Sequence, residues 1–247
     1  MPTETQKYGA LPFDEAIAFF RDKLSIGTMA WDDIWSVQHS RAFMIAGAME
    51  ADLVNDFKAA VDAAIADGES LNSFRERFDD IVARYGWTYK GGRNWRTKVI
   101  YDTNMRTAYS AGRYRQMTDP DVLTLRPYWQ YRHGGSSDPR PSHLDLDGKV
   151  FAHDDPIWNT HFPPNGWGCK CFVVSLSERD LAKRGKTGTD TAPELTYYDY
   201  TDQKGRTHRV PEGIDPGFEY NPGKAAARTD TILRDNLTNA DATARKT

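Results

Sequence analysis

Two cysteines and three histidines gather in one short stretch of the chain, and their types are those of metal ligands. Cys169 and Cys171 are the only cysteines and are separated by one residue, while His143, His153 and His161 precede them. Residues two apart in a strand share one face, and thiolate and imidazole are the usual donors of a closed tetrahedral zinc site. His143, Cys169 and Cys171 are therefore the first candidates for a structural zinc site. The alternative is two small buried hydrophobes and surface histidines.

A second chemistry is suggested by the polar cluster that begins at His143. Asp145 and Asp147 follow it at alternate positions, and a histidine with two carboxylates could serve metal-assisted hydrolysis. Asp147 and Gly148 also read more simply as a turn that leads into a strand. The sequence contains no nucleophile elbow, P-loop, H-E-x-x-H or G-x-G-x-x-G motif. A metal-dependent hydrolase or nuclease using these three residues is the alternative function.

Basic residues recur along residues 93–115, in a segment whose pattern predicts one long helix. Only Asp102 lies nearby as an opposite charge. The segment is either a solvated helix surface or a contact for phosphate groups, DNA or an acidic partner. The residues that would make this contact are Arg93, Arg96, Lys98, Arg106, Arg113 and Arg115.

The composition is that of an ordinary soluble protein. The 247 residues carry a formal net charge of −3, which gives no overall attraction to nucleic acid or to an anionic membrane. Two cysteines are too few for a disulfide framework and suit a reducing compartment. No apolar run approaches the length of a membrane span, and the first residues lack the pattern of a secretory signal. We expect a protein without a membrane partner that works where it is made.

The elements that must position these residues follow from hydrophobic spacing. Apolar residues at helical spacing predict helices over residues 13–24, 31–45, 53–65 and 74–85 and a long helix over 94–119. Extended segments are predicted over 123–131, 149–151 and 170–176, then a short helix over 177–185 and a hairpin over 197–210. The predicted class is α+β, with a helical N-terminal half followed by a small mixed α+β C-terminal module of short antiparallel strands.

Three regions are predicted from these elements. Residues 1–88 form a helical docking region, residues 89–223 form the α+β module, and residues 224–247 form a flexible C-terminal tail. The first boundary is placed in a glycine-containing connector, and the tail is short of large apolar residues.

Several motifs together resemble one known family. They are the helical segment YDTNMRTAY at residues 101–109, the pair Asp147-Gly148, Trp158 after an Asp-Pro, and the segment of Pro163, Pro164, Asn165, Gly166, Trp167, Gly168, Cys169, Lys170 and Cys171. With the closing segment GFEYNPG at residues 217–223, they resemble the phage Mu protein F-like head morphogenesis proteins over roughly residues 40 to 223. Asp147, Gly148, Trp158, Pro163, Pro164, Gly166 and Trp167 are expected to be structural motif residues.

The resemblance implies a minor capsid component of a tailed phage or prophage. Such a protein lies in the virion, inside the phage head, and is present in the host cytoplasm during assembly. Portal protein and capsid or scaffold proteins are the implied partners, with DNA as a further contact, and no catalytic activity is implied. Many relatives have a histidine just before the cysteine pair, where this chain has residues 166–168, so the fourth zinc ligand would move to His153 or His161.

Overall fold

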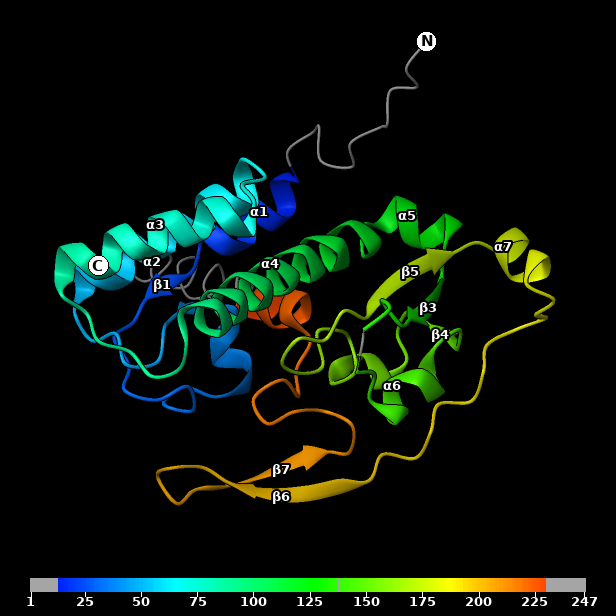
Figure 1. Ribbon diagram of the computed structural model, residues 1–247. Helices are drawn as coiled ribbons and strands as arrows, with labels where there is room; N and C mark the ends of the chain where they lie inside the picture. The colour runs from blue at the N-terminus through cyan, green and yellow to red at the C-terminus, as the bar shows by residue number, and fades with distance from the viewer. Residues whose placement is uncertain (1–12, 137, 230–247) are drawn as a thin grey trace, which may run out of the picture.

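The computed structural model describes residues 13–136 and 138–229, and the chain folds as an α+β protein (Figure 1). Helices dominate the N-terminal half, and short strands lie in the C-terminal half, as predicted. The helices are α1 (Asp14–Arg21), α2 (Ala51–Ala66), α3 (Leu71–Tyr85), α4 (Arg93–Met117), α5 (Pro120–Leu125), α6 (Pro141–Leu146) and α7 (Glu178–Lys183). The strands are β1 (Leu24–Ser25), β2 (Ala42–Phe43), β3 (Tyr128–Arg132), β4 (Val150–Ala152), β5 (Phe172–Leu176), β6 (Tyr197–Thr201) and β7 (Thr207–Pro211).

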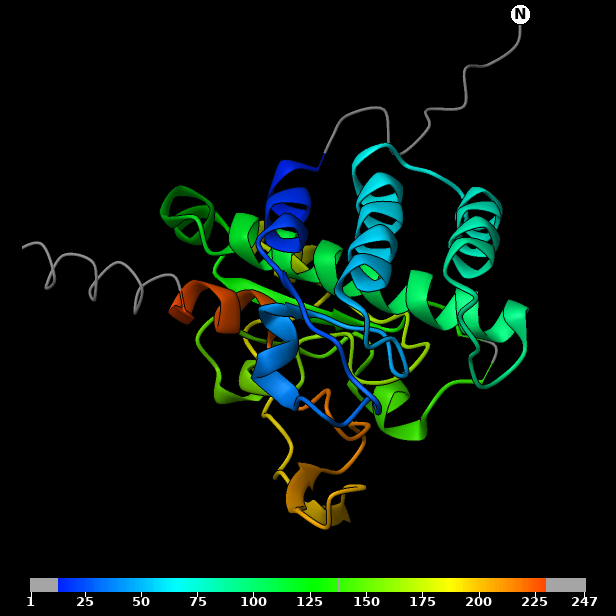
Figure 2. The ribbon, with the colours of Figure 1, turned by 90° about the vertical axis from the view of Figure 1, so that its left-hand side faces the viewer.

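Helices α1, α2 and α3 lie side by side across the long helix α4 (Figure 2). Their predicted apolar stripes meet in one core, in which Phe20, Phe57 and Phe78 are completely buried. Helix α4 joins the same core through residues such as Ala108. At Gly112, helix α4 approaches α1 so closely that a Cβ added to this glycine would lie 2.7 Å from the backbone nitrogen of Ala16. The predicted helices at 13–24, 53–65, 74–85 and 94–119 are thus confirmed.

The predicted helix over residues 31–45 is wrong. This segment contains only the 3-10 helix Ser36–Ser40, and strand β2 at its end pairs in parallel with β1. The carboxylate of Asp33 accepts hydrogen bonds from the backbone nitrogens of Met29 and Ala30, at 2.7 Å and 2.9 Å. Such side-chain bonds to the backbone compete with helix formation. Trp31 and Trp35 pack against Tyr200 of the distant hairpin β6–β7, whereas Phe43 of β2 packs on Phe20 in the helical core.

Strands β4, β3 and β5 form an antiparallel sheet in that order, with β3 in the middle. Gln130 of β3 lies opposite Val150 on one side and Val174 on the other. The sheet packs with the end of α4 around a second core that contains Trp129 and Phe162. Residues 123–125, predicted to begin an extended segment, instead belong to helix α5 because the chain supplies helix-start chemistry just before them. The Asp119 side chain accepts hydrogen bonds from two backbone nitrogens of the first turn, and proline occupies the first helical position.

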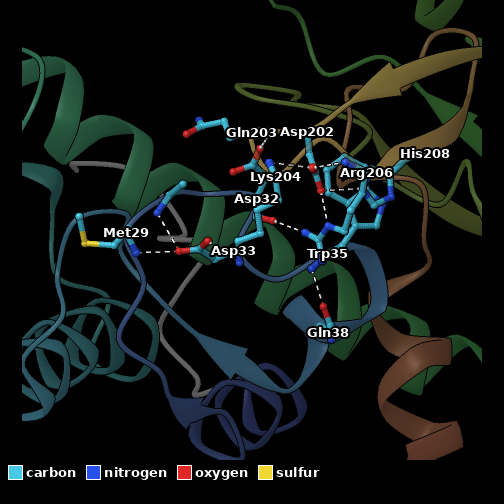
Figure 3. Close-up of polar contacts among 11 residues, drawn as sticks. Met29, Asp32, Asp33, Trp35, Gln38, Asp202, Gln203, Lys204, Arg206 and His208 are labelled. Atoms are coloured by element: carbon cyan, nitrogen blue, oxygen red, sulfur yellow. Dashed lines mark hydrogen bonds and ion pairs between the residues drawn. The ribbon is translucent and has the colours of Figure 1, made fainter.

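The predicted hairpin is confirmed as β6–β7, and polar contacts fasten it to the N-terminal loop (Figure 3). The buried carboxylate of Asp202 accepts hydrogen bonds from Arg206 Nε at 2.6 Å and from His208 Nε2 at 2.9 Å. Arg206 also donates through Nη2 to the carbonyl of Asp32 at 3.0 Å, and the ring of Trp35 stacks on His208 with 3.7 Å between centroids. These contacts with the hairpin therefore hold the N-terminal segment as a loop, where the sequence predicted a helix over residues 31–45.

Helix α4 contributes to both cores, since its first part packs with α1–α3 and its last residue, Met117, packs against the sheet. The predicted boundary after residue 88 therefore separates α4 from helices with which it shares a core. A helix over residues 222–229 extends into the predicted tail of 224–247, and residues 230–247 lie outside the described residues. Among the described helices, none has the length and apolarity needed to cross a bilayer.

Candidate functional site

His143, Cys169 and Cys171 come together in one compact cluster. The Nδ1 atom of His143 lies 3.8 Å from Sγ of Cys169 and 3.6 Å from Sγ of Cys171. The three potential ligand atoms all lie within 4.8 Å of one another, and both thiols are free. His143 is 4% exposed and Cys169 is 3% exposed, so the cluster is largely shielded from water. The residues singled out first as zinc ligands are thus neighbours in space.

The orientation of His143 is set by the loop that follows β7. His143 lies on the short helix α6, which begins with Pro141 at its first position. Its Nε2 atom lies 2.8 Å from the carbonyl oxygen of Gly213, which can only accept a hydrogen bond, so Nε2 carries the proton. Nδ1 therefore presents its lone pair to the two sulfurs. Gly213 has a φ of +84°, and a Cβ there would lie 2.5 Å from Oγ of Ser142, so the loop requires glycine.

The loop before the cysteines is fastened by Asn165. This side chain is fully buried, accepts a hydrogen bond from the hydroxyl of Tyr131 at 3.0 Å and donates to the carbonyl of Thr160 at 3.2 Å. The next residue, Gly166, accepts a backbone hydrogen bond from Cys169 at 3.1 Å. These contacts place the cysteine pair against α6 before β5 begins.

The two thiols titrate as a coupled pair. A hydrogen bond from Cys169 lowers the pKa of Cys171 to about 7. A hydrogen bond with Tyr131 acts in the same direction, and burial acts in the opposite one. The bond between the two thiols, with burial, raises the pKa of Cys169 to about 12. The physical reason is that the thiol that keeps its proton stabilises the neighbouring thiolate. The pair therefore loses its first proton near neutral pH, which favours the form that binds a metal ion.

The remaining predicted zinc ligands lie elsewhere. The ring of His153 packs near Trp129, with 6.3 Å between centroids, and does not join the cluster. His161 is buried, and this burial lowers the pKa of His161 to about 4. His161 is therefore neutral at physiological pH. Among the described residues, three of the proposed ligands gather and the fourth does not.

The two carboxylates of the alternative hydrolase site do not converge on the cluster. Asp147 accepts hydrogen bonds from Arg132 Nε at 3.0 Å and from the backbone nitrogen of His133 at 2.8 Å. Although burial opposes it, these hydrogen bonds hold the pKa of Asp147 below its usual value. Asp145 is exposed and lines the same cavity as His143, but it is not part of the cluster of His143, Cys169 and Cys171. The carboxylate of Asp147 thus ties the end of β3 to the turn that leads into β4. This agrees with the interpretation of Asp147 and Gly148 as a turn before a strand.

The other motif residues shape loops and cores. Gly148 adopts a φ of +80° in the turn before β4, and Trp158 is buried in the second core. The peptide bond between Pro163 and Pro164 is cis. Trp167 is 40% exposed and packs one ring face toward the segment that follows β7. The motif is therefore mostly structural, and Trp167 is its most accessible large side chain.

The basic residues of α4 do not form one continuous surface. Three of them already have partners within the protein. Arg93 forms an ion pair with Asp79, and Lys98 forms one with Asp102. Arg96 donates a hydrogen bond to the carbonyl of Ala46. Arg106 is partly buried, whereas Arg113 and Arg115 are exposed near the end of the helix. Lys98 is exposed as well but is paired with Asp102, so the predicted basic surface is smaller than the sequence suggested.

A groove that the sequence did not predict lies beside α4. It has a volume of about 440 Å³ and is enclosed by α4, the loop of residues 31–46 and the segment 216–220. Its walls are largely apolar and include Trp31, Trp95 and Trp167, and Trp95 is 58% exposed. Lys23 and Arg96 also line it. Burial, with the nearby charges of two other basic side chains, lowers the pKa of Lys23 to about 7.

Comparison with known proteins places the chain among phage proteins. Residues 55–174 match the family model described as Phage Mu protein F like protein. The chain is 34% identical, over an alignment of 267 positions, to a protein provisionally named capsid assembly protein F in Escherichia phage Mu, covering 94% of this chain and 60% of that protein. It is 32% identical over 230 positions to the Mu-like prophage FluMu F protein of Haemophilus influenzae, covering 83% of this chain and 55% of that protein.

The chain thus spans a little over half the length of these curated relatives. No solved structure matches it. The matched residues run from within α2 into β5 and contain all three members of the cluster, His143, Cys169 and Cys171. Through residues 55–174, the chain belongs to the Phage Mu protein F like family.

Proposed function

We propose that the protein is a minor capsid protein that acts in phage head morphogenesis without catalysing a reaction. The support is its family and the name of the phage Mu relative, which describes capsid assembly. In this proposal the protein works in the host cytoplasm during assembly and stays inside the head of the virion. Its partners are the portal protein and the capsid or scaffold proteins.

The observation that carries the proposal is the apolar groove beside α4. A groove of about 440 Å³ that is lined by three tryptophans, with Trp95 58% exposed, offers a partner a concave apolar surface rather than a single exposed side chain. Tryptophan is also the residue type most enriched at interface hot spots. Trp95, Trp31 and Trp167 together offer the anchoring surface that an assembly protein needs.

The lining of the groove also indicates what its occupant looks like. Lys23 and Arg96 are basic, and neither Asp nor Glu lines the groove. An apolar segment that carries an acidic side chain would match both the apolar walls and the basic residues. We propose that the portal protein supplies this segment.

The test is a pull-down of the portal protein of the same phage with the full chain, comparing wild type with Trp95→Ala. Loss of a hot-spot tryptophan is expected to weaken binding by about tenfold or more. Trp95 is more than half exposed, so its replacement is expected to leave the fold intact, which circular dichroism would check.

The matched control is Leu125→Ala, since Leu125 is 71% exposed at the end of α5 and lies outside the groove. It should retain portal binding. Equal binding by wild type and Trp95→Ala would show that the groove is not the portal site. No binding of portal, capsid or scaffold protein by the wild type would remove the proposed function itself.

A contact with DNA is a second proposal, supported only by Arg113 and Arg115. Because the other basic residues of α4 are partly buried or have partners within the protein, we expect a weak, sequence-independent contact that falls steeply with salt. Gel-shift measurements on Arg113→Ala with Arg115→Ala would test it, and salt-independent binding would contradict it.

The hydrolase or nuclease alternative has less support from the geometry. Nδ1 of His143 faces two sulfurs and Nε2 donates to Gly213, so neither ring nitrogen is directed at Asp145 or Asp147. Incubation with DNA and RNA, with and without divalent metal, tests this directly. Metal-dependent cleavage that is lost in His143→Ala would reverse the order of the two functions.

A further inference from the structure

We propose that His143, Cys169 and Cys171 bind one structural zinc ion through Nδ1 and the two Sγ atoms. The ion would join α6 to the start of β5. Through the hydrogen bond of His143 to Gly213, it would also hold the loop that follows β7. The proposal concerns the internal architecture and is independent of the partner that the groove binds.

The spacing of the three atoms fits a tetrahedral zinc site. With zinc–sulfur and zinc–nitrogen bonds of about 2.3 Å and 2.0 Å, neighbouring sulfur and nitrogen ligands lie about 3.6 Å apart. The two sulfurs lie 3.8 Å and 3.6 Å from Nδ1 of His143. An ion at the centre of the cluster would therefore reach all three atoms with little movement of the chain.

Hydrogen bonding alone accounts for the arrangement less well. The unprotonated Nδ1 atom has a single lone pair and can accept one hydrogen bond, yet two sulfurs lie at nearly equal distances from it. The second thiol would have to donate elsewhere, to the first sulfur or to the hydroxyl of Tyr131. Convergence of two sulfurs and one nitrogen on a common point is what coordination of a single ion requires.

The protein also orients the histidine as zinc ligands are usually oriented. A zinc-bound histidine almost always donates its other ring nitrogen to a carbonyl or carboxylate, which fixes the tautomer. Here Nε2 donates to the carbonyl of Gly213 at 2.8 Å. A Cβ at Gly213 would meet Oγ of Ser142 at 2.5 Å, so the glycine allows this carbonyl to come close.

The donor set selects the metal. Two thiolates with an imidazole favour zinc over magnesium or calcium, which prefer oxygen ligands. On binding, two S–H bonds break, two zinc–sulfur bonds form and two protons pass to solvent, with no change of oxidation state. Two thiolates balance the charge of Zn²⁺, so the buried site becomes neutral.

The surroundings indicate a structural rather than a catalytic ion. A cavity of about 280 Å³ borders His143 and Gly213, but neither cysteine lines it. The two thiols therefore do not open onto the cavity that a substrate could enter. The described residues bring together three ligands, so solvent would fill the fourth position, and it is the separation of the thiols from the cavity that favours a structural role.

The test begins with elemental analysis of the full chain, purified under reducing conditions without chelator. We expect about one zinc ion per chain. Cys171→Ser should lose most of the zinc, whereas His153→Gln, which lies outside the cluster, should keep it. Removal of zinc with a chelator should lower the melting temperature by several degrees, because a ligand bound only to the folded state stabilises it.

A second measurement covers the case in which Cys171→Ser fails to fold. The wild-type protein is stripped of metal and loaded with Co²⁺, whose charge-transfer absorption reports thiolate ligation directly. The expected result is this absorption at one equivalent, displaced by one equivalent of zinc. Absence of both stoichiometric zinc and the cobalt–thiolate absorption would overturn the proposal, as would full zinc retention by folded Cys171→Ser.

Discussion

The close contact between α1 and α4 at Gly112 allows one stability effect to be worked out in detail. An alanine there would place its Cβ 2.7 Å from the backbone nitrogen of Ala16 and 3.0 Å from its Cα. Both atoms belong to the backbone of α1, so no side-chain rotation can relieve the overlap. Helix α1 must move away by about 0.7 Å to restore ordinary contact, and gaps of this size forfeit a quarter to a half of the local dispersion attraction.

Two opposing effects decide the sign. Alanine is favoured over glycine inside a helix by about 1 kcal/mol. Overpacking a tight contact costs about 1–3 kcal/mol, and the movement also draws Ile17 and Phe20 partly out of the first core. We therefore expect Gly112→Ala to lower the free energy of unfolding by about 1 kcal/mol net, with a fall in melting temperature of about 2–4 °C.

Thermal and urea unfolding followed by circular dichroism measure this effect. The control is Gly188→Ala, because a Cβ at Gly188 meets nothing within 4 Å and the backbone there does not need a positive φ. The control is expected to be neutral or slightly stabilising. A melting temperature for Gly112→Ala equal to or above that of the wild type would refute the close packing of α1 on α4.

Three further perturbations test other parts of the structure. Phe57→Ala removes a fully buried ring from the first core and should cost about 3–5 kcal/mol in urea unfolding, so a cost below 1 kcal/mol would contradict its burial. The pKa of Lys23 is lowered to about 7 from 10.5, so the unfolded state binds more protons between these values and stability should rise with pH from 7 to 10. That rise should be reduced in Lys23→Met. Hydrogen bonds from His208 and Arg206 lower the pKa of Asp202, although burial acts in the opposite direction. The stability that the ionised Asp202 contributes to the folded state is therefore complete above about pH 4 and is lost at lower pH. Asp202→Asn should melt at a lower temperature at pH 7, with the difference from wild type shrinking in acid.

The helices of the first core could be predicted because their information is local. Apolar residues at helical spacing mark α1, α2 and α3, and Ser70 and Gly86 mark both ends of α3 with standard caps. The failure at residues 31–45 has the opposite cause. There the apolar residues include Trp35, which stacks on His208 far away in the chain. No local pattern indicates that a residue of this segment will pack against a distant hairpin.

The candidate sites show the same division. Residue type was enough to select His143, Cys169 and Cys171, because few combinations of side chains suit zinc and this one is concentrated in a short stretch. The sequence could not separate His153 from these ligands, since its position depends on how β4 ends. The groove was missed because separate segments build it, and only the placement of Trp95 on an otherwise polar turn of α4 hinted at it.

Because one face of α4 packs against α1–α3 and its end packs against the sheet, the two halves of the protein are expected to melt together. Amide hydrogens in the middle of α4 should exchange with solvent only when the whole chain opens, and those at its exposed start should exchange sooner. A fragment cut after residue 88 would keep this helix but lose the partners that cover its apolar stripe. Such a fragment should aggregate, and genetic dissection of the protein should therefore keep α1 to β5 in one piece.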